Sequence, residues 1–310
     1  MENKIKTCSF ALNINIFYMI KINGVKINVE SFPDGTQRIM DFNENLIHVG
    51  YENTTPHYEI VWLYESDAEM FTLMCLVSHI RDNHWYGTEA RIHLTLPYVP
   101  NARMDRTYSI KEVFTLKHFG NFINSLNFDK VIVFDVHSNV SSAIINRIHH
   151  LRYIDSLVKN AIDIIDDDNL AIYFPDAGAY KRYANIFCIS DCTKFYGKKV
   201  RDWETGQIKH LSVYNEFDEL VTNNEVYGKT ILMIDDIISY GGTMAYSADK
   251  LKELGADKIY AYASHTENSI LDQEKGTFLK RLDCGTIDKL FTTNSIYNGS
   301  HPNIKVIHEF

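Results

Sequence analysis

The chain has 310 residues, of which 45% are hydrophobic and 23% are charged, and this composition excludes a disordered protein. The net charge of −9 argues against a surface for duplex nucleic acid, and no segment approaches the ~20 consecutive apolar residues that a membrane-spanning helix needs. Five cysteines without a CxxC pair favour neither a disulfide framework nor a zinc knuckle. We therefore expect a cytoplasmic protein with neither nucleic acid nor membrane as a partner.

Predicted helices and strands alternate along the chain in the pattern of βα units around a parallel sheet. Apolar residues at helical spacing predict helices, and short β-branched runs that end in polar or acidic residues predict strands. In chain order these are a helix over 68–82, strands over 91–98, 130–138, 170–178 and 229–237, a helix over 243–256 and a strand over 258–265. In such sheets, ligands bind at the C-terminal ends of the strands.

The length and the repeated βα pattern predict two domains in tandem. The best boundary lies near residues 152–160, after the segment IINRIHHLRYIDSL. We expect an α/β fold with one domain over 1–155 and a second over 156–310, each a mostly parallel sheet flanked by helices. The last residues are expected to pack back on the first domain.

The segment ILMIDDIISYGGTM (231–244) carries the strongest chemical signal. Asp235 and Asp236 end an apolar strand, where their carboxylates are suited to accept hydrogen bonds from the vicinal hydroxyls of a sugar. Gly241 and Gly242 permit a tight turn with inward N–H groups, and the helix that opens at Thr243 favours an anion. The alternative is an ordinary strand-turn-helix junction with a solvated acidic pair. The acidic pair between an apolar strand and a glycine turn favours a site for a phosphorylated sugar.

This segment resembles the phosphoribosyl loop of type I phosphoribosyltransferases and of ribose-phosphate pyrophosphokinases. Other segments resemble the pyrophosphokinases alone and follow in their order from residue 32 to residue 296. They are ESFPDGT (30–36), LPYVPNARMDR (96–106), VIVFDVHSN (131–139), FPDAGAYKR (174–182) and FTTNSI (291–296). A phosphoribosyltransferase, which has one such domain, does not account for these matches.

The resemblance implies two phosphoribosyltransferase-like domains, the first on the ATP side and the second with the ribose-phosphate loop. It implies a Mg²⁺-dependent transfer of the β,γ-diphosphate of ATP to the anomeric 1-hydroxyl of a 5-phosphorylated ribose, with release of AMP. ATP is then a co-substrate and Mg²⁺ the cofactor. It also implies a homo-oligomer built from dimers, such as a hexamer, with adenine sites shared between subunits.

The motifs carry family roles onto residues of this chain. The implied metal ligands are His137 and Asp176. The implied ATP-binding residues are Phe32, Asp34, Thr36, Arg103, Met104 and Asp105. The implied ribose-phosphate-binding residues are Asp235, Asp236, Ser239, Tyr240, Gly241, Gly242 and Thr243. Magnesium prefers oxygen ligands and keeps several waters, so a single imidazole is an unusual but tolerable member of its site.

The segment CTKFYGKKVRDWETGQIKHLS (192–212) is polar and corresponds to a mobile catalytic loop with a Lys-x-Arg pattern in the family. Lys199 and Arg201 fit that spacing best, and Lys198 is a rival. They would neutralise charge that develops on the transferred diphosphate. The alternative is a basic, solvated hairpin.

This sequence departs from the family pattern at four of these positions. Ser239 and Tyr240 replace an Asp-Thr pair that helps to hold the 5-phosphate. An aromatic ring in place of a threonine donor suggests a 5-phosphate that bears a further group, as in ADP-ribose, and plain ribose 5-phosphate is the alternative. Thr36 replaces a glutamate and Met104 a glutamine, which puts the selectivity for the nucleotide base in doubt.

Two other functions are the alternatives to the pyrophosphokinase. The first is a non-catalytic regulatory paralogue. The presence of the acidic pair together with His137, Asp176 and Arg103 argues against it, because a protein without catalysis has no physical need for them. The second is a phosphoribosyltransferase, which consumes the activated sugar and needs no ATP. Release of AMP from ATP distinguishes the pyrophosphokinase from both.

Overall fold

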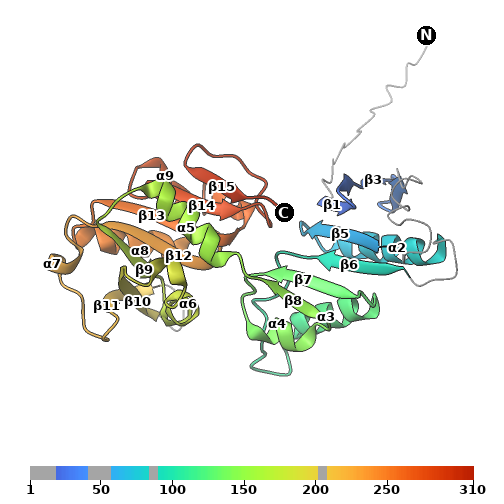
Figure 1. Ribbon diagram of the computed structural model, residues 1–310, viewed down its shortest axis with the longest axis horizontal. Helices are drawn as coiled ribbons and strands as arrows, with labels where there is room; N and C mark the ends of the chain where they lie inside the picture. The colour runs from blue at the N-terminus through green and yellow to red at the C-terminus, as the bar shows by residue number, and fades with distance from the viewer. Residues whose placement is uncertain (1–18, 41–56, 84–89, 202–207) are drawn as a thin grey trace, which may run out of the picture.

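The structure is a computed structural model that describes residues 19–40, 57–83, 90–201 and 208–310. Two sheets form two halves that lie side by side along the long axis of the molecule (Figure 1). The predicted α/β fold with two mostly parallel sheets flanked by helices is therefore confirmed. No helix in the described ranges is both long and apolar enough to span a bilayer.

The first half contains a six-stranded sheet with the order β2-β1-β5-β6-β7-β8. Strands β5 to β8 are parallel, and β1 joins β5 and β2 in antiparallel pairing. The strands are β1 (Met19–Ile22), β2 (Val25–Lys26), β5 (His57–Leu63), β6 (Arg91–Thr95), β7 (Lys130–Phe134) and β8 (Ile148–Leu151). Its helices are α2 (Ala68–Asn83), α3 (Thr115–Ser125) and α4 (Asn139–Ile144).

One face of this first sheet is buried and the other is half-exposed. Alternate residues of β5, among them Ile60 and Trp62, pack with Leu73 of α2 and Phe119 of α3 in one core. The intervening residues of β5 are only partly buried. This difference follows from the period of two along a strand, since successive side chains point to opposite faces.

The second half contains a seven-stranded sheet with the order β11-β10-β9-β12-β13-β14-β15. All neighbours are parallel except β10 and β11. The strands are β9 (Leu170–Phe174), β10 (Thr193–Arg201), β11 (Ile208–Asn215), β12 (Thr230–Ile238), β13 (Lys258–Thr266), β14 (Lys289–Thr293) and β15 (Ile304–His308). Its helices are α5 (Ile154–Ile165), α6 (Ala177–Tyr183), α7 (Asn223–Val226), α8 (Gly242–Glu253) and α9 (Thr277–Asp283), with 3-10 turns η1 (Phe187–Ile189) and η2 (Asn268–Leu271).

Helices cover both faces of the second sheet. Residues of α8 and α9 pack on one face in a core that includes Met233 and Ile259. Residues of α5 and α6 pack on the other face with Phe174 and Tyr262. Strand β12 is therefore covered by helices on both faces, and its first five residues are all buried.

The predicted strands and helices are confirmed, with boundaries that differ by a few residues. The strands predicted over 130–138 and 170–178 end at Phe134 and Phe174. Their polar continuations leave the sheet, because Ser138 and Asp176 cap the helices α4 and α6 with their side chains. The segment 192–212, for which we expected a mobile loop or a hairpin, holds most of the antiparallel strands β10 and β11, as the hairpin alternative predicts.

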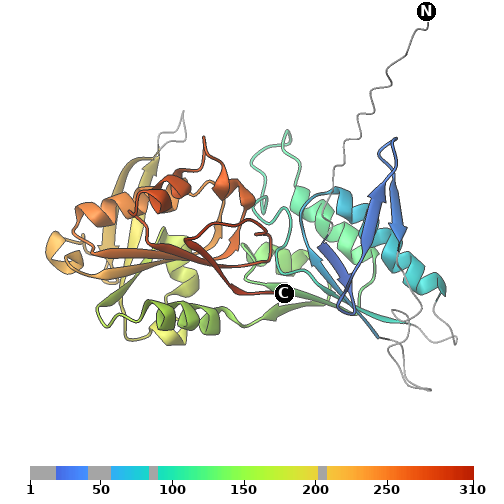
Figure 2. The same ribbon diagram turned by 90° about the horizontal axis from the view of Figure 1, so that it is seen from above.

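Helix α5 connects the two sheets, and the division expected at residue 155 falls within it. Its buried residues Leu157, Val158 and Ala161 belong to the core of the second half. We therefore propose that the second domain begins with α5. The C-terminus lies between the halves (Figure 1 and Figure 2), where the Phe310 ring is 5.5 Å from the ring of Phe134 on β7.

Candidate active site

The predicted acidic and histidine side chains follow the C-terminal ends of three parallel strands. Asp135 and His137 follow β7 of the first half, and Asp176 follows β9 of the second half. Asp235 and Asp236 lie near the end of β12. The ends of β7 and β12 face each other across the junction of the two halves, because side chains from both strands are in contact there.

His137 and Asp236 join the two halves directly. Nδ1 of His137 lies 2.5 Å from Oδ2 of Asp236, and Nε2 of His137 makes no hydrogen bond with the described residues. The carboxylate of Asp236 is only 7% exposed, whereas the imidazole is 38% exposed. The acidic pair of the predicted sugar site and the predicted metal ligand of the other half therefore share one site.

Arg182 of helix α6 lies in the centre of this contact. Its Nη1 is 3.1 Å from Oδ2 of Asp236 and 4.0 Å from Oδ1 of Asp135, and its Nη2 donates to the carbonyl oxygen of His137. Burial acts to raise the pKa of Asp236, but the hydrogen bond to His137 and the charge of Arg182 hold it below its usual range. Asp236 is therefore ionised at neutral pH.

Asp135 is the second buried carboxylate beside Arg182. Its Oδ2 accepts hydrogen bonds from the hydroxyls of Tyr183, at 2.7 Å, and of Ser264 on β13. Burial raises its pKa to about 6, although both hydrogen bonds act in the opposite direction. Arg182 is thus the cation that faces two buried carboxylates, one from each half of the protein.

Asp235 differs from its neighbour in the direction of its pKa shift. Burial raises the pKa of Asp235 well above its usual range, and the adjacent negative charge of Asp236 acts in the same direction. Asp176 also contributes to this repulsion, which places it within electrostatic range of the acidic pair. A cation bound near Asp235 would relieve that repulsion.

The glycine turn lies between β12 and α8, as predicted. Gly241 has φ of +73°, and a Cβ there would lie 2.3 Å from Cβ of Phe278. Any larger residue would therefore strain the backbone and clash with α9. The hydroxyl of Thr277 donates to the carbonyl oxygen of Tyr240 and fixes the turn beside the N-terminus of α8. Helix α8 begins at Gly242, and Ser239 and Thr243 are partly buried on either side of the turn.

Lys199 projects toward Asp176, and Lys198 projects the other way. Nζ of Lys199 is 3.2 Å from Oδ2 of Asp176, whose Oδ1 accepts from the backbone N–H groups of Gly178 and Ala179. Nζ of Lys198 is instead 2.5 Å from Asp218. Burial acts to raise the pKa of Asp176, but the backbone N–H groups and Lys199 hold this pKa below its usual range. Between the two lysines, the geometry thus selects Lys199.

Strand pairing explains the position of Lys199. Phe195 and Tyr196 of β10 pair with Tyr173 and Phe174 of β9, so β10 continues past the end of β9. The residues beyond that end lie over the turn that follows β9, where Asp176 begins helix α6. Arg201 ends β10, but its side chain lies outside the described part of the chain.

The predicted ATP segment contributes two residues to the junction. Nη1 of Arg103 is 3.1 Å from Oε1 of Glu267, which follows β13 of the second half. Asp105 forms two hydrogen bonds with Arg106, which lower its pKa to about 2, with smaller contributions from Ser138 and His137. Met104 is 36% exposed. This segment therefore lies beside His137.

The other predicted ATP segment lies elsewhere. Phe32, Asp34 and Thr36 form the turn of a separate hairpin between β3 (Asn28–Ser31) and β4 (Gln37–Met40). The hairpin projects from the first half on the side away from the second half (Figure 2). Phe32 is half-exposed, and a hydrogen bond from the Thr36 hydroxyl lowers the pKa of Asp34. The structure does not bring these residues to the junction within one chain.

Four residues of the junction were not assigned roles from the sequence. They are Arg182, Asp135, Ser264 and Glu267. Arg182 belongs to the motif FPDAGAYKR and Asp135 to VIVFDVHSN, so each lay within a segment already singled out. Ser264 and Glu267 stand at the end of a predicted strand, and that position was their only signal.

A buried histidine also crosses the junction. Nε2 of His265 on β13 lies 3.2 Å from the carbonyl oxygens of both Phe134 and Asp135, and its Nδ1 lies 2.8 Å from the hydroxyl of Ser295. Because carbonyl oxygens only accept, Nε2 carries the proton of a neutral ring. Burial lowers the pKa of His265 to about 4.

His265 is expected to make the fold sensitive to acid. Its pKa lies below the value near 6.5 of an unfolded chain, so its contribution is complete above pH 6.5 and is lost as the pH falls toward 4. The difference corresponds to about 3 kcal/mol. The free energy of unfolding, measured with urea, should therefore fall less between pH 7 and pH 4 for His265→Gln than for the unchanged protein. His149→Gln, at an exposed position, serves as the control. Equal pH dependence of all three would contradict the assignment.

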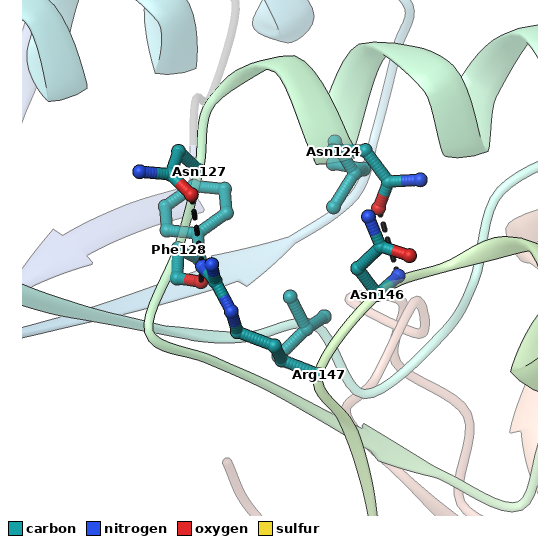
Figure 3. A pocket seen from close by; sticks show the side chains of 7 residues that line it. Asn124, Asn127, Phe128, Asn146 and Arg147 are labelled. Carbon is teal, nitrogen blue, oxygen red and sulfur yellow. Dashed lines mark hydrogen bonds between the residues drawn. The ribbon is translucent and has the colours of Figure 1, made fainter.

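Two cavities lie away from this junction. The first, of about 340 Å³, is lined by Asn124, Asn127, Phe128, Asn146 and Arg147, near the start of β7 (Figure 3). Nη1 of Arg147 donates to the side-chain oxygen of Asn127 and to the carbonyl oxygen of Phe128. The second, of about 570 Å³, lies by the start of β10 and includes Lys194 and Lys229. Neither contains a predicted site residue.

Comparison with known proteins identifies the fold and its relatives. No family model matches the chain. A ribose-phosphate pyrophosphokinase of Methanobrevibacter smithii is 27% identical over 77% of this chain and 77% of its own length. Another, from Thermoplasma volcanium, is 27% identical over 93% of both chains. The crystal structure of phosphoribosylpyrophosphate synthetase from Mycobacterium smegmatis superposes with a TM-score of 0.68 at 18% identity, over 91% of this chain and 85% of that one. The chain is thus a divergent relative of the ribose-phosphate pyrophosphokinases, with their two-domain α/β fold.

Proposed function

We propose that this protein is an ATP-dependent diphosphokinase that transfers the β,γ-diphosphate of ATP to the anomeric 1-hydroxyl of a 5-phosphorylated ribose and releases AMP. The curated relatives named above, which are ribose-phosphate pyrophosphokinases, support this class of reaction. The observation that carries the proposal is the contact between His137 and Asp236. It joins the half that we propose to bind the nucleotide to the loop that we propose to bind the sugar.

Mg²⁺ fits the side chains of this site. Two adjacent carboxylates are present, Asp236 buried and Asp235 half-buried, and the pKa of Asp235 is raised in part by the charge of Asp236. Asp176 adds a third carboxylate within electrostatic range, and Nε2 of His137 is free of partners among the described residues. We propose that His137 and Asp176 hold Mg²⁺, directly or through water. When bound, Mg²⁺ would neutralise the phosphates of ATP.

The remaining site residues have separate roles in the proposed reaction. Asp235 and Asp236 would accept hydrogen bonds from the ribose hydroxyls, and the turn at Gly241 and Gly242 would bind the 5-phosphate with backbone N–H groups at the start of α8. Arg103 would contact the phosphates of ATP by exchanging its partner Glu267 for them. Transfer then depends on position and charge neutralisation, without a covalent intermediate.

Lys199 and Arg201 would neutralise the charge that develops on the transferred diphosphate. Lys199 is well placed for this role, because its Nζ lies beside Asp176 and its side chain is only 10% exposed. An ammonium group in such a protected position stabilises a developing anion more strongly than one in water does. Arg201 stands two residues further along β10 and remains part of the proposal from the sequence.

The surroundings of Tyr240 favour a 5-phosphate that bears a further group. Its ring is 39% exposed at the phosphate turn, and Nζ of Lys275 lies 6.0 Å from the ring centroid. An exposed ring with a cation beside it is suited to stack on a second group and to pair with a second phosphate. ADP-ribose has both features together with a free anomeric hydroxyl, so we propose it as a substrate alongside ribose 5-phosphate.

The exposed hairpin from β3 to β4 supports a homo-oligomer built from dimers. Phe32 and Asp34 lie away from the junction of their own chain, and in the resemblance they contact the adenine of a neighbouring subunit. We therefore propose that each complete ATP site contains a hairpin from a second copy. An assembly such as a hexamer satisfies this requirement.

The reaction is tested by incubating the purified chain with ATP, Mg²⁺ and a panel of 5-substituted riboses. We expect equimolar AMP and 1-diphosphorylated sugar, identified by mass spectrometry, with ADP-ribose turned over at least as fast as ribose 5-phosphate. Light scattering on the same sample should show more than one subunit.

Other results would favour the alternatives. If ribose 5-phosphate supports AMP release and ADP-ribose does not, ADP-ribose is excluded as a substrate and the diphosphokinase reaction is retained. A product that forms without ATP but requires a nucleobase would indicate a phosphoribosyltransferase. If no sugar of the panel supports AMP release by a folded oligomer, the proposed enzyme is wrong and a regulatory paralogue remains.

A further inference from the structure

Three metal-ligating side chains meet on the half-exposed face of the first sheet, apart from the candidate active site. They are His57 and Glu59 of β5 and His93 of β6. Across the described ranges, this is the one group of at least three His, Cys, Asp or Glu side chains whose ligand atoms all lie within 4.8 Å of one another. The carboxylates and imidazole of the junction do not meet this condition.

The three side chains converge on one carboxylate oxygen. Oε1 of Glu59 is 2.6 Å from Nε2 of His57 and 3.2 Å from Nδ1 of His93. The two imidazole rings pack edge to face, with centroids 4.2 Å apart. In a tetrahedral site with bonds of 2.0–2.2 Å, ligand atoms are about 3.4 Å apart. The separation of 3.2 Å is close to this value, whereas that of 2.6 Å is a hydrogen bond, which a bound ion would replace.

Strand pairing holds the three residues in place. Glu59 lies directly opposite His93 in the parallel ladder, and His57 precedes Glu59 by two residues and so shares its face. The backbone of Glu59 is fixed on its other side, where its N–H donates to the side chain of Asn23 and its carbonyl oxygen accepts from the N–H of Asn23. Ligands on paired strands need little ordering when a metal binds.

We propose that His57, Glu59 and His93 form a binding site for a divalent transition-metal ion of the Zn²⁺ type. Two imidazoles and one carboxylate are a known ligand set for Zn²⁺ and leave one position for water. The side chains are between 21% and 46% exposed, so the ion can enter from solvent. Arg91 and Lys130 lie on the same face, opposite His57 and His93 in the ladder. The hydrogen bonds of the Glu59 carboxylate go to the two histidines and not to these cations.

The proposed site differs in its chemistry from the proposed Mg²⁺ site. Imidazole nitrogen suits Zn²⁺, Co²⁺ and Ni²⁺, whereas Mg²⁺ prefers oxygen ligands and gives up its waters reluctantly. The site also lies within β5 and β6, with His57 at the start of β5, whereas the residues of the junction lie at or beyond the C-terminal ends of strands. Binding of Zn²⁺ here should therefore persist in millimolar Mg²⁺ and should not depend on the diphosphokinase reaction.

The test uses the full chain without a histidine tag, stripped of metal and then held in Mg²⁺. Calorimetric titration with Zn²⁺ should show one equivalent bound, and titration with Co²⁺ should produce visible absorption bands from ligation by nitrogen. His93→Ala and Glu59→Gln should each weaken Zn²⁺ binding by about 100-fold or more. His149→Ala, on an exposed position of β8 in the same sheet, and His137→Ala, at the junction, should leave this equivalent unchanged.

Circular dichroism and thermal unfolding will establish that each variant is folded, and His57→Ala replaces any variant that is not. The proposal is overturned if the unchanged protein binds no Zn²⁺ in the presence of Mg²⁺. It is also overturned if His93→Ala and Glu59→Gln bind as the unchanged protein does, or if only His137→Ala loses the equivalent.

Discussion

Lys199→Ala is expected to lower kcat of the proposed diphosphokinase by about 10²–10³-fold, with a much smaller change in KM for ATP. The ammonium group lies 3.2 Å from Asp176 in a side chain that is 10% exposed, where water screens its charge poorly. Its interaction with the diphosphate grows as charge develops in the transition state, so its loss affects kcat more than binding. Steady-state kinetics with ATP and the preferred sugar measure both constants.

Lys198→Ala is the matched control for this prediction. The two lysines are adjacent in β10, and both changes remove one positive charge. Nζ of Lys198, however, lies 2.5 Å from Asp218 and 4.1 Å from the centroid of Tyr214, on the other face of the strand. We expect kcat of Lys198→Ala to stay within about threefold of that of the unchanged protein, because the change removes only an exposed ion pair. If Lys198→Ala proves as damaging as Lys199→Ala, or Lys199→Ala is harmless, the assignment of Lys199 is wrong.

The comparison of these lysines shows what the sequence was able to predict. An apolar strand followed by acidic residues is a local pattern, so the strands and the acidic pair at Asp235 and Asp236 were found without a structure. Which of two adjacent lysines faces a site depends on the pairing of β10 with β9. That pairing joins segments that are distant in sequence, and the polar composition of residues 192–212 left a mobile loop and a hairpin both open.

Arg182 was missed for a related reason. The motif FPDAGAYKR offers Lys181 and Arg182 in succession, and only the orientation of α6 determines which one faces the junction. The partners of Arg182 come from β7 and β12, more than 40 residues away in each direction. Local patterns therefore located the strand ends, whereas the ion pairs between the two halves required the tertiary structure.

Arg182→Met is expected to destabilise the protein by about 3 kcal/mol at pH 8, measured by urea unfolding. The change leaves Asp135 and Asp236 without their cation, and these carboxylates are 10% and 7% exposed. The value lies at the lower end for breaking a buried ion pair, because the guanidinium itself is 30% exposed. Activity should fall as well, since Arg182 also donates to the carbonyl oxygen of His137.

The pH dependence of this loss follows from Asp135. Its pKa of about 6 lies above the value near 3.8 of an unfolded chain, so its ionisation lowers stability as the pH rises from about 4 through 6. At pH 5 the protonated carboxyl no longer needs a cation. Arg182→Met should therefore be less destabilising at pH 5 than at pH 8, and adding Asp135→Asn should recover part of the loss at pH 8.

Arg281→Met is the control for Arg182→Met. It removes an arginine from an exposed carboxylate, and so distinguishes the effect of carboxylate burial from the effect of losing an arginine. Arg281 is 33% exposed, much like Arg182, and forms three hydrogen bonds with Asp249, but Asp249 is 38% exposed. Water can solvate that carboxylate once the arginine is gone, so the loss should stay below about 1 kcal/mol. Equal losses for the two variants would mean that buried charge at the junction does not set the stability. A larger loss for Arg182→Met at pH 8, diminished at pH 5, would show that one cation holds the two halves of the site together.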